Sequence, residues 1–505
     1  MRKENSLKNL FFGLGSFVIT TLMGIVIPRL FIVSYGSEVN GLIASVKQIF
    51  AYFALLEAGV GGAALQALYG PMARNDHQEL SSILSATNQF YKKTGIFYGI
   101  GVAVLAVAYP LLVKADIPFY IIIGVILLQG EVGVVKYFVT AKLQLLLKVD
   151  GKNYIITNLG TVFSILSNIA RISLMYMGAK VLMVQAVFCL VDAAQVLLIV
   201  SYTRKHYGWL DLKAKPNYGA VAQKNSVLVH QLSGLIFNNT DTMILTFFCN
   251  LKVVSVYAMY SMLFNMAASV MGYVSSSVNF AMGQIFNSDR ERYEKIQETY
   301  ETYYLAVSFS IFTVLYIFIL PFLRLYTAGV SDVVYLDRWL PVLFTAYQLL
   351  NYGRNTSASI IDYAGHYKQT QWRAILEMSI NLTVSFVAVR FWGIYGVLAG
   401  TVAALLYRTN DTILYANHRI MNRSAWPTYR RWLRNFAMVL LCGWLGTFLP
   451  ESYSGYLMLV GTAALVGIGV LVLFLGVNTL LEKTARNMVW FYLKPVVLRI
   501  VGKRQ

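Results

Sequence analysis

Charged residues are scarce in this sequence. Only 13% of the 505 residues are Asp, Glu, Lys or Arg, whereas a soluble protein carries about a quarter. Hydrophobic residues make up 57% of the chain, and the mean hydropathy is +0.58. This composition indicates a protein that crosses a membrane many times.

Cysteine is also rare, and long hydrophilic stretches are missing. Cys189, Cys249 and Cys442 lie in apolar runs, so their spacing gives neither a metal site nor a disulfide framework. Because the sequence has no long polar segment, we expect no attached soluble catalytic domain. We therefore expect a protein that is not an enzyme.

Acidic residues are outnumbered by basic ones, 23 to 42, which gives a net charge of +19. Such an excess can indicate nucleic-acid binding. In a membrane protein, however, basic residues orient the loops and contact anionic lipid heads. We therefore expect membrane lipids as partners and no nucleic acid.

Apolar segments long enough to span a bilayer, about 20 residues each, occur fourteen times. They are 9–34, 41–70, 94–113, 118–141, 153–177, 180–203, 225–249, 252–285, 302–325, 338–364, 370–391, 393–417, 433–449 and 454–477. The sequence thus predicts an all-α integral membrane protein with fourteen transmembrane helices.

Basic residues collect on alternate sides of these helices. One side holds Arg2, Lys3, Lys8, Arg74, Lys92, Lys93, Arg204, Lys205, Lys213, Lys215, Lys224, Arg419, Arg423, Arg430, Arg431, Arg434 and the basic tail. The other side holds only Lys114, Lys180, Lys252, Arg324, Arg338 and Arg390. The positive-inside rule then places both termini in the cytoplasm, with the tail 479–505 as a basic amphipathic segment on the inner leaflet.

The two halves of the chain resemble each other. "ENSLKNLFFG" before the first helix resembles "KNSVLVHQLSG" before the seventh. Gly70 and Asp76 align with Gly283 and Asp289, within polar stretches that predict short amphipathic helices. Because six helices are an even number, the halves share one orientation, and parallel repeats of this kind place the substrate between them.

This repeat predicts five parts of the chain. They are an N-lobe of helices 1–6 (1–204), a cytoplasmic linker (205–224), a C-lobe of helices 7–12 (225–421), two appended helices (422–478) and the tail (479–505).

Several charged and polar residues fall inside the predicted helices. A charge near the bilayer centre costs about 2.5–3.5 kcal/mol, so such residues normally face a bundle interior or a wet cavity. Cations at several depths would suit phosphate or diphosphate. The candidate substrate-binding residues are Arg29, Lys47, Lys136, Arg354, Asn238 and Asn351. Arg354 is expected to face the cavity, whereas Arg408 and Asp411, at spacing i, i+3, could simply pair.

Three stretches carry a resemblance to a known family. They are "VIPRLF" in the first helix, "LLEAGVGGAALQALYGPMARND" across the second, and "LIFNNTDTMIL" in the seventh. Over about residues 5–420, the chain resembles the polysaccharide-transport family of the multidrug/oligosaccharidyl-lipid/polysaccharide (MOP) exporter superfamily.

The resemblance implies two six-helix lobes around a cationic cavity. Such a protein would turn an oligosaccharide on a polyprenyl diphosphate from the inner to the outer leaflet of the bacterial cytoplasmic membrane by alternating access. Its partners would include a glycan polymerase and glycosyltransferases. Related flippases use arginines on early helices for the diphosphate, and Arg29 and Lys47 match them in helix and depth.

Some relatives also bind a coupling ion in the second lobe. Here Asp241, Glu377, Asn381 and Thr401 could supply oxygen ligands for Na⁺, although a proton relay or simple buried pairing explains them equally well. No other cofactor is expected.

Two other functions compete with the flippase. A drug or metabolite cation antiporter of the same superfamily usually has twelve helices and an acidic site, which the appended helices and the basic interior disfavour. A membrane glycan polymerase typically carries a large outer loop with catalytic residues, whereas the longest predicted outer loop, 327–337, is short.

Overall fold

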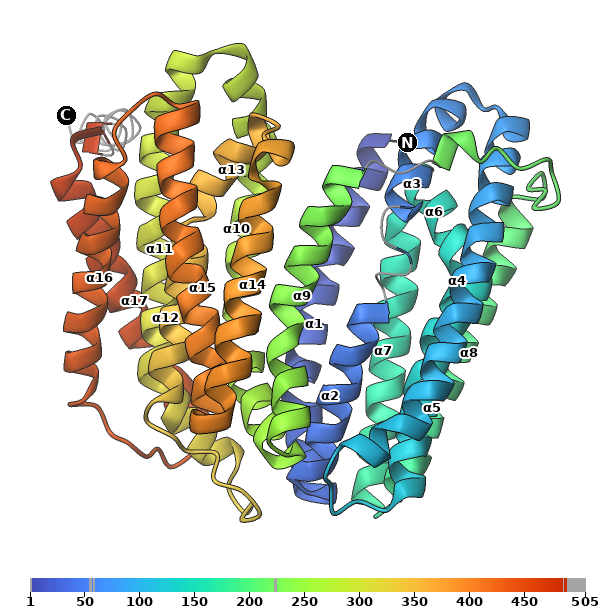
Figure 1. Cartoon of the computed structure of the whole chain (residues 1–505), viewed down its shortest axis with the longest axis horizontal. Coiled ribbons are helices and arrows are strands. Elements are labelled where there is room, and N and C mark those ends of the chain that lie inside the picture. Colours follow the sequence, from blue (N-terminus) through green and yellow to red (C-terminus); the bar gives the residue numbers. More distant parts are fainter. Residues whose placement is uncertain (1, 54–56, 58–59, 222–224, 485, 488–505) are drawn as a thin grey trace, which may run out of the picture. The chain divides into compact units, whose positions relative to one another are not determined.

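A computed structural model describes residues 2–53, 57, 60–221, 225–484 and 486–487 of the chain (Figure 1). The regular structure of these residues is entirely helical. The first half contains α1 (Arg2–Tyr35), α2 (Ser37–Phe53), α3 (Val60–Arg74), α4 (His77–Leu112), α5 (Phe119–Val135), the π-helix η2 (Lys136–Thr140), α6 (Ala141–Val149), α7 (Asn153–Tyr176), α8 (Val181–His206) and the short 3₁₀ helix η3 (Gly219–Val221). The second half contains α9 (Asn225–Phe248), α10 (Leu251–Ser288), α11 (Arg290–Tyr326), α12 (Leu340–Gly353), α13 (Asn355–Tyr363), α14 (Tyr367–Trp392), α15 (Ile394–Leu414), the π-helix η4 (Tyr415–Ile420), α16 (Trp426–Gly446) and α17 (Tyr456–Leu481).

Each of the fourteen predicted spans coincides with a helix or an interrupted pair of helices. The second span consists of α2 and α3, the fourth of α5 and α6 joined by η2, and the tenth of α12 and α13. Eight helical segments within the described residues are long and apolar enough to cross a membrane on their own. The described lengths of α2, α3, α12 and α13 are too short to qualify separately.

Contacts divide the chain into two compact units. Unit 1 comprises Met1–Ala258 and Gly329–Val333, and unit 2 comprises Met259–Ala328 and Val334–Gln505. The seventh helix, α9, therefore belongs to unit 1, where it packs against α2. In the predicted N- and C-lobes the same helix opens the second half.

Corresponding helices of the two halves begin in the same way. Asp76 caps α4 by accepting a hydrogen bond from the backbone N–H of Glu79 at 2.9 Å, and Asp289 caps α11 by accepting one from Arg292 at 3.0 Å. A carboxylate at this position satisfies one of the otherwise unpaired N–H groups of the first turn. The alignment of Asp76 with Asp289 thus corresponds to a shared local structure.

The sequence predicted that the polar stretches at these starts form separate short helices, and this prediction is wrong. They form the first turns of α4 and α11, which run on for 36 and 37 residues into the apolar spans. No proline lies between the polar and apolar parts. The backbone hydrogen-bond ladder therefore continues without a break.

Large apolar side chains cover the outside of the molecule. On α17, for example, Leu457 is 90% exposed and Leu465 74%. Soluble proteins rarely expose large contiguous apolar patches, whereas a helix in lipid must do so. The exposed side chains therefore support the assignment of these helices to a membrane.

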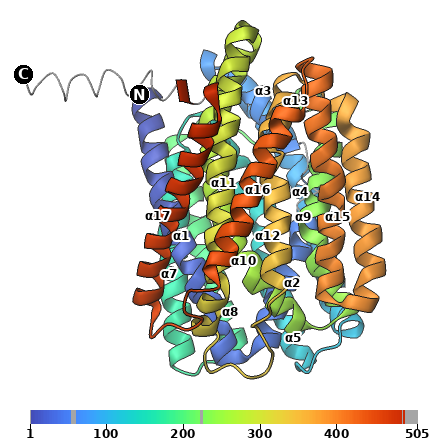
Figure 2. The ribbon, with the colours of Figure 1, turned by 90° about the vertical axis from the view of Figure 1, so that its left-hand side faces the viewer.

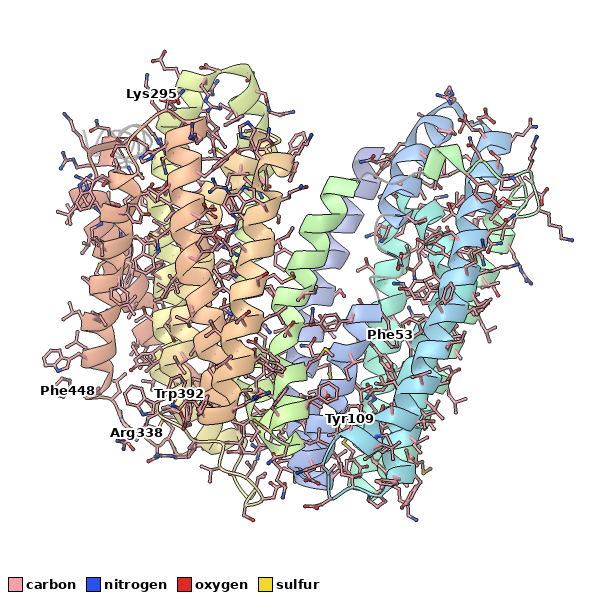
Figure 3. The ribbon with its side chains drawn as sticks, viewed as in Figure 1. Phe53, Tyr109, Lys295, Arg338, Trp392 and Phe448 are labelled. Atoms are coloured by element: carbon pink, nitrogen blue, oxygen red, sulfur yellow. The ribbon has the colours of Figure 1, made fainter. Side chains whose placement is uncertain are left out.

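The connections between the helices of unit 2 lie at its two ends, as the predicted spans require. Lys295, near the start of α11, lies at one end, and Arg338, Trp392 and Phe448 lie at the opposite end (Figure 3). Arg338 and Phe448 lie in the connections that precede α12 and α17, and Trp392 is the last residue of α14. The assignment of either end to the cytoplasm stays a prediction.

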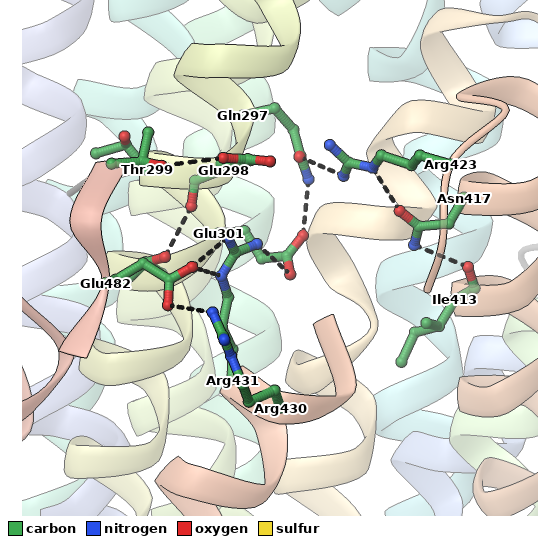
Figure 4. A network of polar contacts seen from close by, with 12 residues as sticks. Gln297, Glu298, Thr299, Glu301, Ile413, Asn417, Arg423, Arg430, Arg431 and Glu482 are labelled. Atoms are coloured by element: carbon green, nitrogen blue, oxygen red, sulfur yellow. Dashed lines mark hydrogen bonds and ion pairs between the residues drawn. The ribbon is translucent and has the colours of Figure 1, made fainter. Parts of the chain in front are cut away.

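The two appended helices, α16 and α17, pack beside α11 in unit 2 (Figure 2). A buried polar network joins the three helices (Figure 4). The guanidinium of Arg431 lies 3.2 Å from a carboxylate oxygen of Glu301 and 2.6 Å from one of Glu482. Arg434 also reaches Glu482, at 3.3 Å. The sequence placed Arg431 in a cytoplasmic loop, but its side chain is only 2% exposed.

Candidate functional site

Arg354 interrupts the tenth span. It is the single residue between α12 and α13, with φ −92° and ψ −11°. The preceding residue, Gly353, faces α16 so closely that a Cβ atom would lie 2.1 Å from Nε1 of Trp432. A glycine is therefore needed where the interrupted helix meets the first appended helix.

The side chain of Arg354 is paired with an acid. Its Nη1 lies 2.8 Å from Oε1 of Glu377 on α14, and its Nη2 donates to Oδ1 of Asn351 at 3.3 Å. The side chain is 16% exposed. The sequence predicted that Arg354 faces a cavity and did not predict its acidic partner. A buried cation is far less costly beside a carboxylate.

Glu377 links Arg354 to further charges. Its second oxygen, Oε2, lies 3.2 Å from Nε of Arg408 on α15. Arg408 also pairs with Asp411 at 2.9 Å, which confirms the pairing that their spacing suggested. Arg373 on α14 forms an ion pair with the other oxygen of Asp411. We call these five residues, Arg354, Arg373, Arg408, Glu377 and Asp411, the arginine cluster.

The arginine cluster carries an excess of positive charge. Three guanidinium groups face two carboxylates, which leaves one positive charge uncompensated. The side chains are between 11% and 22% exposed, so they are shielded but reachable. Guanidinium groups bind carboxylate and phosphate oxygens with the same two-pronged geometry. Phosphate oxygens are therefore chemically matched to the guanidinium groups of this cluster.

Sequence reasoning missed Arg373. It lies at the start of an apolar run, where a basic residue is normally interfacial. Its i, i+4 spacing to Glu377 would have placed both side chains on one face of the helix.

A second ion pair lies at an interruption in unit 1. Lys136 is the first residue of the π-helix η2, and its Nζ lies 3.2 Å from Oε2 of Glu57. The hydroxyl of Tyr91 donates to the other oxygen of Glu57 at 3.0 Å. Single turns of π-helix occur often at functional sites. Glu57 was not among the predicted site residues.

Lys136 and Arg354 thus lie in the fourth predicted span of each half, and each pairs with a glutamate of its own unit. The glutamates come from different places, since Glu57 lies between α2 and α3 and Glu377 lies on α14. The Lys136 side chain is 44% exposed, compared with 16% for Arg354. Lys136 is therefore the more accessible of the two cations.

The other predicted substrate-binding residues are less closely connected. Lys47 lies exposed on α2 and forms no ion pair among the described residues. Arg29 lies partly buried on α1, one residue after Pro28, and has a contact partner. Asn351 is the hydrogen-bond partner of Arg354. The side chain of Asn238 lies outside the described residues.

The predicted coupling-ion ligands are divided between the units. Asn381 on α14 donates to the hydroxyl of Thr401 on α15 at 2.9 Å, and Glu377 lies one turn away. Asp241 lies on α9 in unit 1 and accepts a hydrogen bond from Tyr257 at 3.0 Å.

Glu377 is also occupied by two guanidinium groups, which compete with a cation for its oxygens. Among the described residues, no group of three or more His, Cys, Asp or Glu could hold a metal ion. A coupling ion stays a prediction.

Solved membrane transporters have a similar fold. The inward closed conformation of the lipid II flippase MurJ superposes with a TM-score of 0.65 at 14% identity and covers 98% of this chain and 99% of its own. An inward-facing multidrug resistance MATE transporter of the MOP superfamily gives 0.63 at 12% identity, covering 80% and 95%. A MOP superfamily transporter from Pyrococcus furiosus gives 0.53 at 13% identity, covering 83% and 96%.

Neither protein-family models nor curated sequences give a match. The likeness is therefore one of fold. The chain is an all-α integral membrane protein with the architecture of the MOP superfamily transporters.

Proposed function

We propose that this protein is a flippase for an oligosaccharide carried on a polyprenyl diphosphate. It moves this lipid from the inner to the outer leaflet of the bacterial cytoplasmic membrane by alternating access, with both termini in the cytoplasm. No covalent bond is made or broken. The observation that carries the proposal is the excess positive charge of the arginine cluster, shielded within a membrane-embedded fold.

The extent of the structural likeness favours a flippase over a drug antiporter. The lipid II flippase covers 98% of this chain, including α16 and α17, whereas the multidrug transporter covers 80%. A cationic drug would also be repelled by an excess of guanidinium groups. The antiporter remains the second candidate because its fold is nearly as similar, with a TM-score of 0.63.

In the proposed mechanism, Glu377 acts as a stand-in for the diphosphate. Without substrate, it neutralises Arg354 at 2.8 Å and Arg408 at 3.2 Å. A diphosphate oxygen displaces the carboxylate from Arg354, while Glu377 keeps its contact with Arg408. The exchange replaces one charge-assisted hydrogen bond with another, so binding does not leave a buried charge without a partner.

Unit 1 repeats this exchange with Lys136 and Glu57, which are 3.2 Å apart. Arg29 and Lys47 provide further positive charge on α1 and α2. A proton or Na⁺ gradient drives the cycle, acting either at Asp241 in unit 1 or at Glu377, Asn381 and Thr401 in unit 2. Glycosyltransferases supply the lipid-linked glycan, and a glycan polymerase consumes it after transport.

The stand-in role of Glu377 predicts an unusual gain of affinity. Glu377→Gln removes the competing carboxylate and should tighten binding of inorganic diphosphate by about tenfold, the equivalent of about 1.4 kcal/mol. Isothermal titration calorimetry of the purified protein in lipid nanodiscs measures this change.

Glu451→Gln is the matched control, since Glu451 is a 77% exposed acid that pairs with Arg324. It should leave the affinity unchanged. Equal affinities in wild type and Glu377→Gln would show that Glu377 does not compete with the anion.

Removing the gene from its host separates the two candidate functions. The flippase predicts loss of surface polysaccharide and accumulation of lipid-linked oligosaccharide in the inner leaflet, with unchanged uptake of cationic drugs. Normal surface polysaccharide together with raised drug accumulation would instead identify an antiporter.

A further inference from the structure

Unit 1 contains a cavity that none of the residues discussed so far lines. It has a volume of about 210 Å³ and lies between α7 and α8. Residues of both helices line it, from Gly160 to Asn168 on α7 and from Phe188 to Gln195 on α8. Most of the lining side chains are polar, although both helices are predicted to span the membrane.

The polar side chains of α7 point away from its apolar face. Val162 and Ile169 are exposed, at 51% and 52%. Ser164 and Ser167 lie between them in sequence and line the cavity. Because successive residues turn by about 100° around a helix, these serines lie on the opposite side from the exposed pair.

α8 repeats this spacing. Leu190 and Leu197 are exposed, at 69% and 66%, and Asp192 and Gln195 lie between them and line the cavity. Both helices therefore turn an apolar face outward and a polar face toward the same cavity. Polar side chains in spanning helices normally face the protein interior or a water-filled space.

The cavity also contains a hydrogen-bonding group without a partner. Ser167 is only 4% exposed, and its hydroxyl has no hydrogen-bond partner in the described part of the chain. Leaving such a group unsatisfied costs about 1–3 kcal/mol. Beside it, the amide nitrogen of Asn168 donates to the hydroxyl of Ser164 at 3.4 Å. This distance is near the limit of a hydrogen bond. A bound ligand with hydroxyl groups would hydrogen-bond to Ser164 and Asn168, next to this enclosed hydroxyl.

Aromatic rings complete the lining. Phe163 and Phe188 both border the cavity. The guanidinium of Arg171 lies 3.9 Å from the centroid of Phe188 and occupies one face of that ring. The combination of a flat apolar surface with a carboxylate, two amides and two hydroxyls suits a ring that has apolar C–H faces and hydroxyl edges.

We propose that this cavity binds one neutral hexose unit of the transported glycan. The assignment rests on the proposed function for its biological role. The volume of about 210 Å³ is below the roughly 300–1,000 Å³ of drug-sized sites, so the cavity admits a single ring and not a whole oligosaccharide. Asp192, the one acid in its lining, accepts hydrogen bonds from sugar hydroxyls.

The same chain offers a clean way to close the cavity. A Cβ atom on Gly160 would meet only Nε2 of Gln195, at 3.9 Å, which is ordinary contact. A side chain at position 160 thus starts from a Cβ that has room, and Gly160→Leu adds volume to the lining of the cavity. A non-glycine residue also favours the helix. Val162→Leu, on the exposed face two residues away, is the matched control.

Saturation-transfer difference NMR on the purified full-length protein in nanodiscs tests the assignment. The probes are glucose, galactose, mannose, N-acetylglucosamine and N-acetylgalactosamine. At least one should bind saturably to wild type and to Val162→Leu, and at least tenfold more weakly to Gly160→Leu and Asp192→Asn. Absence of binding by all five sugars, or unchanged binding to Gly160→Leu, would overturn the proposal.

Two further titrations distinguish the sugar site from a cation site and from anion binding at the arginine cluster. Binding of Na⁺ that is lost in Asp192→Asn, without sugar binding, would identify a cation site and reject the sugar. Inorganic diphosphate titrated into the same samples reports on the arginine cluster. Sugar binding without diphosphate binding would support the sugar site and contradict the proposed flippase function. Diphosphate binding without sugar binding would support the flippase function and reject the sugar site.

Discussion

Arg354→Ala should abolish flipping of the lipid-linked oligosaccharide while the protein still reaches the membrane. The variant removes the guanidinium that is proposed to exchange its Glu377 carboxylate partner for the diphosphate. Hydrogen bonds to charged groups contribute about 1.5–3 kcal/mol, so diphosphate binding should weaken by about 10- to 150-fold. Titration of purified protein with inorganic diphosphate and export of surface polysaccharide in cells measure the two effects.

Folding should survive this substitution, because Glu377 keeps Arg408 as a partner at 3.2 Å. Arg354→Lys should retain part of the binding, since an ammonium keeps the charge but loses the two-pronged geometry. Arg324→Ala is the control, because Arg324 is 44% exposed and its ion pair among the described residues is with Glu451. Full export by the double variant Arg354→Ala, Lys47→Ala would remove the site assignment.

Arg431→Ala should strongly destabilise the protein. Arg431 joins Glu301 on α11 to Glu482 at the end of α17, and all three side chains are at most 5% exposed. Glu482 keeps Arg434 as a partner, but Glu301 loses the ion pair that the described residues give it. Removing one partner from a buried ion pair typically costs about 3–5 kcal/mol, because the remaining charge stays buried without compensation. The loss should appear as a lower free energy of unfolding in detergent, measured by denaturant titration.

Arg430→Ala provides a matched comparison, since Arg430 contacts the same Glu482 at 3.3 Å but is 57% exposed. An exposed ion pair contributes about 0–1 kcal/mol, so this variant should resemble wild type. Equal stability of the two variants would show that the buried network does not hold the appended helices.

The network also predicts a dependence on pH. Burial alone would raise the pKa of Glu482, but the hydrogen bond and charge of Arg431, with the charges of Arg434 and Arg430, bring that pKa below its ordinary value of 4.5. A carboxyl group with a depressed pKa stabilises the folded state above its unfolded pKa. This contribution should be lost as the pH falls below about 4.5 in wild type, and it should be absent in Glu482→Gln.

Much of the fold follows from the sequence alone. The positions of the spans depend on hydropathy and length, which are local properties. The alignment of Asp76 with Asp289 correctly marked two equivalent helix starts. The interruption at Arg354 was not predicted, because the approach of Gly353 to Trp432 depends on how α16 packs against α12.

The site was predicted less completely, for a related reason. The Arg408–Asp411 pair could be predicted because both residues lie on one helix. The pairing of Arg354 with Glu377 joins two helices, and no periodicity reveals such a contact. Arg431 was assigned to a loop because basic residues usually flank spans, whereas two acids from neighbouring helices hold it in the interior.

Reconstitution into liposomes tests the central claim most directly. A polyprenyl diphosphate oligosaccharide with a labelled sugar is placed in one leaflet, and its appearance in the other is followed by accessibility to a membrane-impermeant lectin. The account predicts that wild-type protein moves the lipid and that Arg354→Ala does not. A wild-type rate equal to that of protein-free liposomes, or an equal rate for Arg354→Ala, would contradict it.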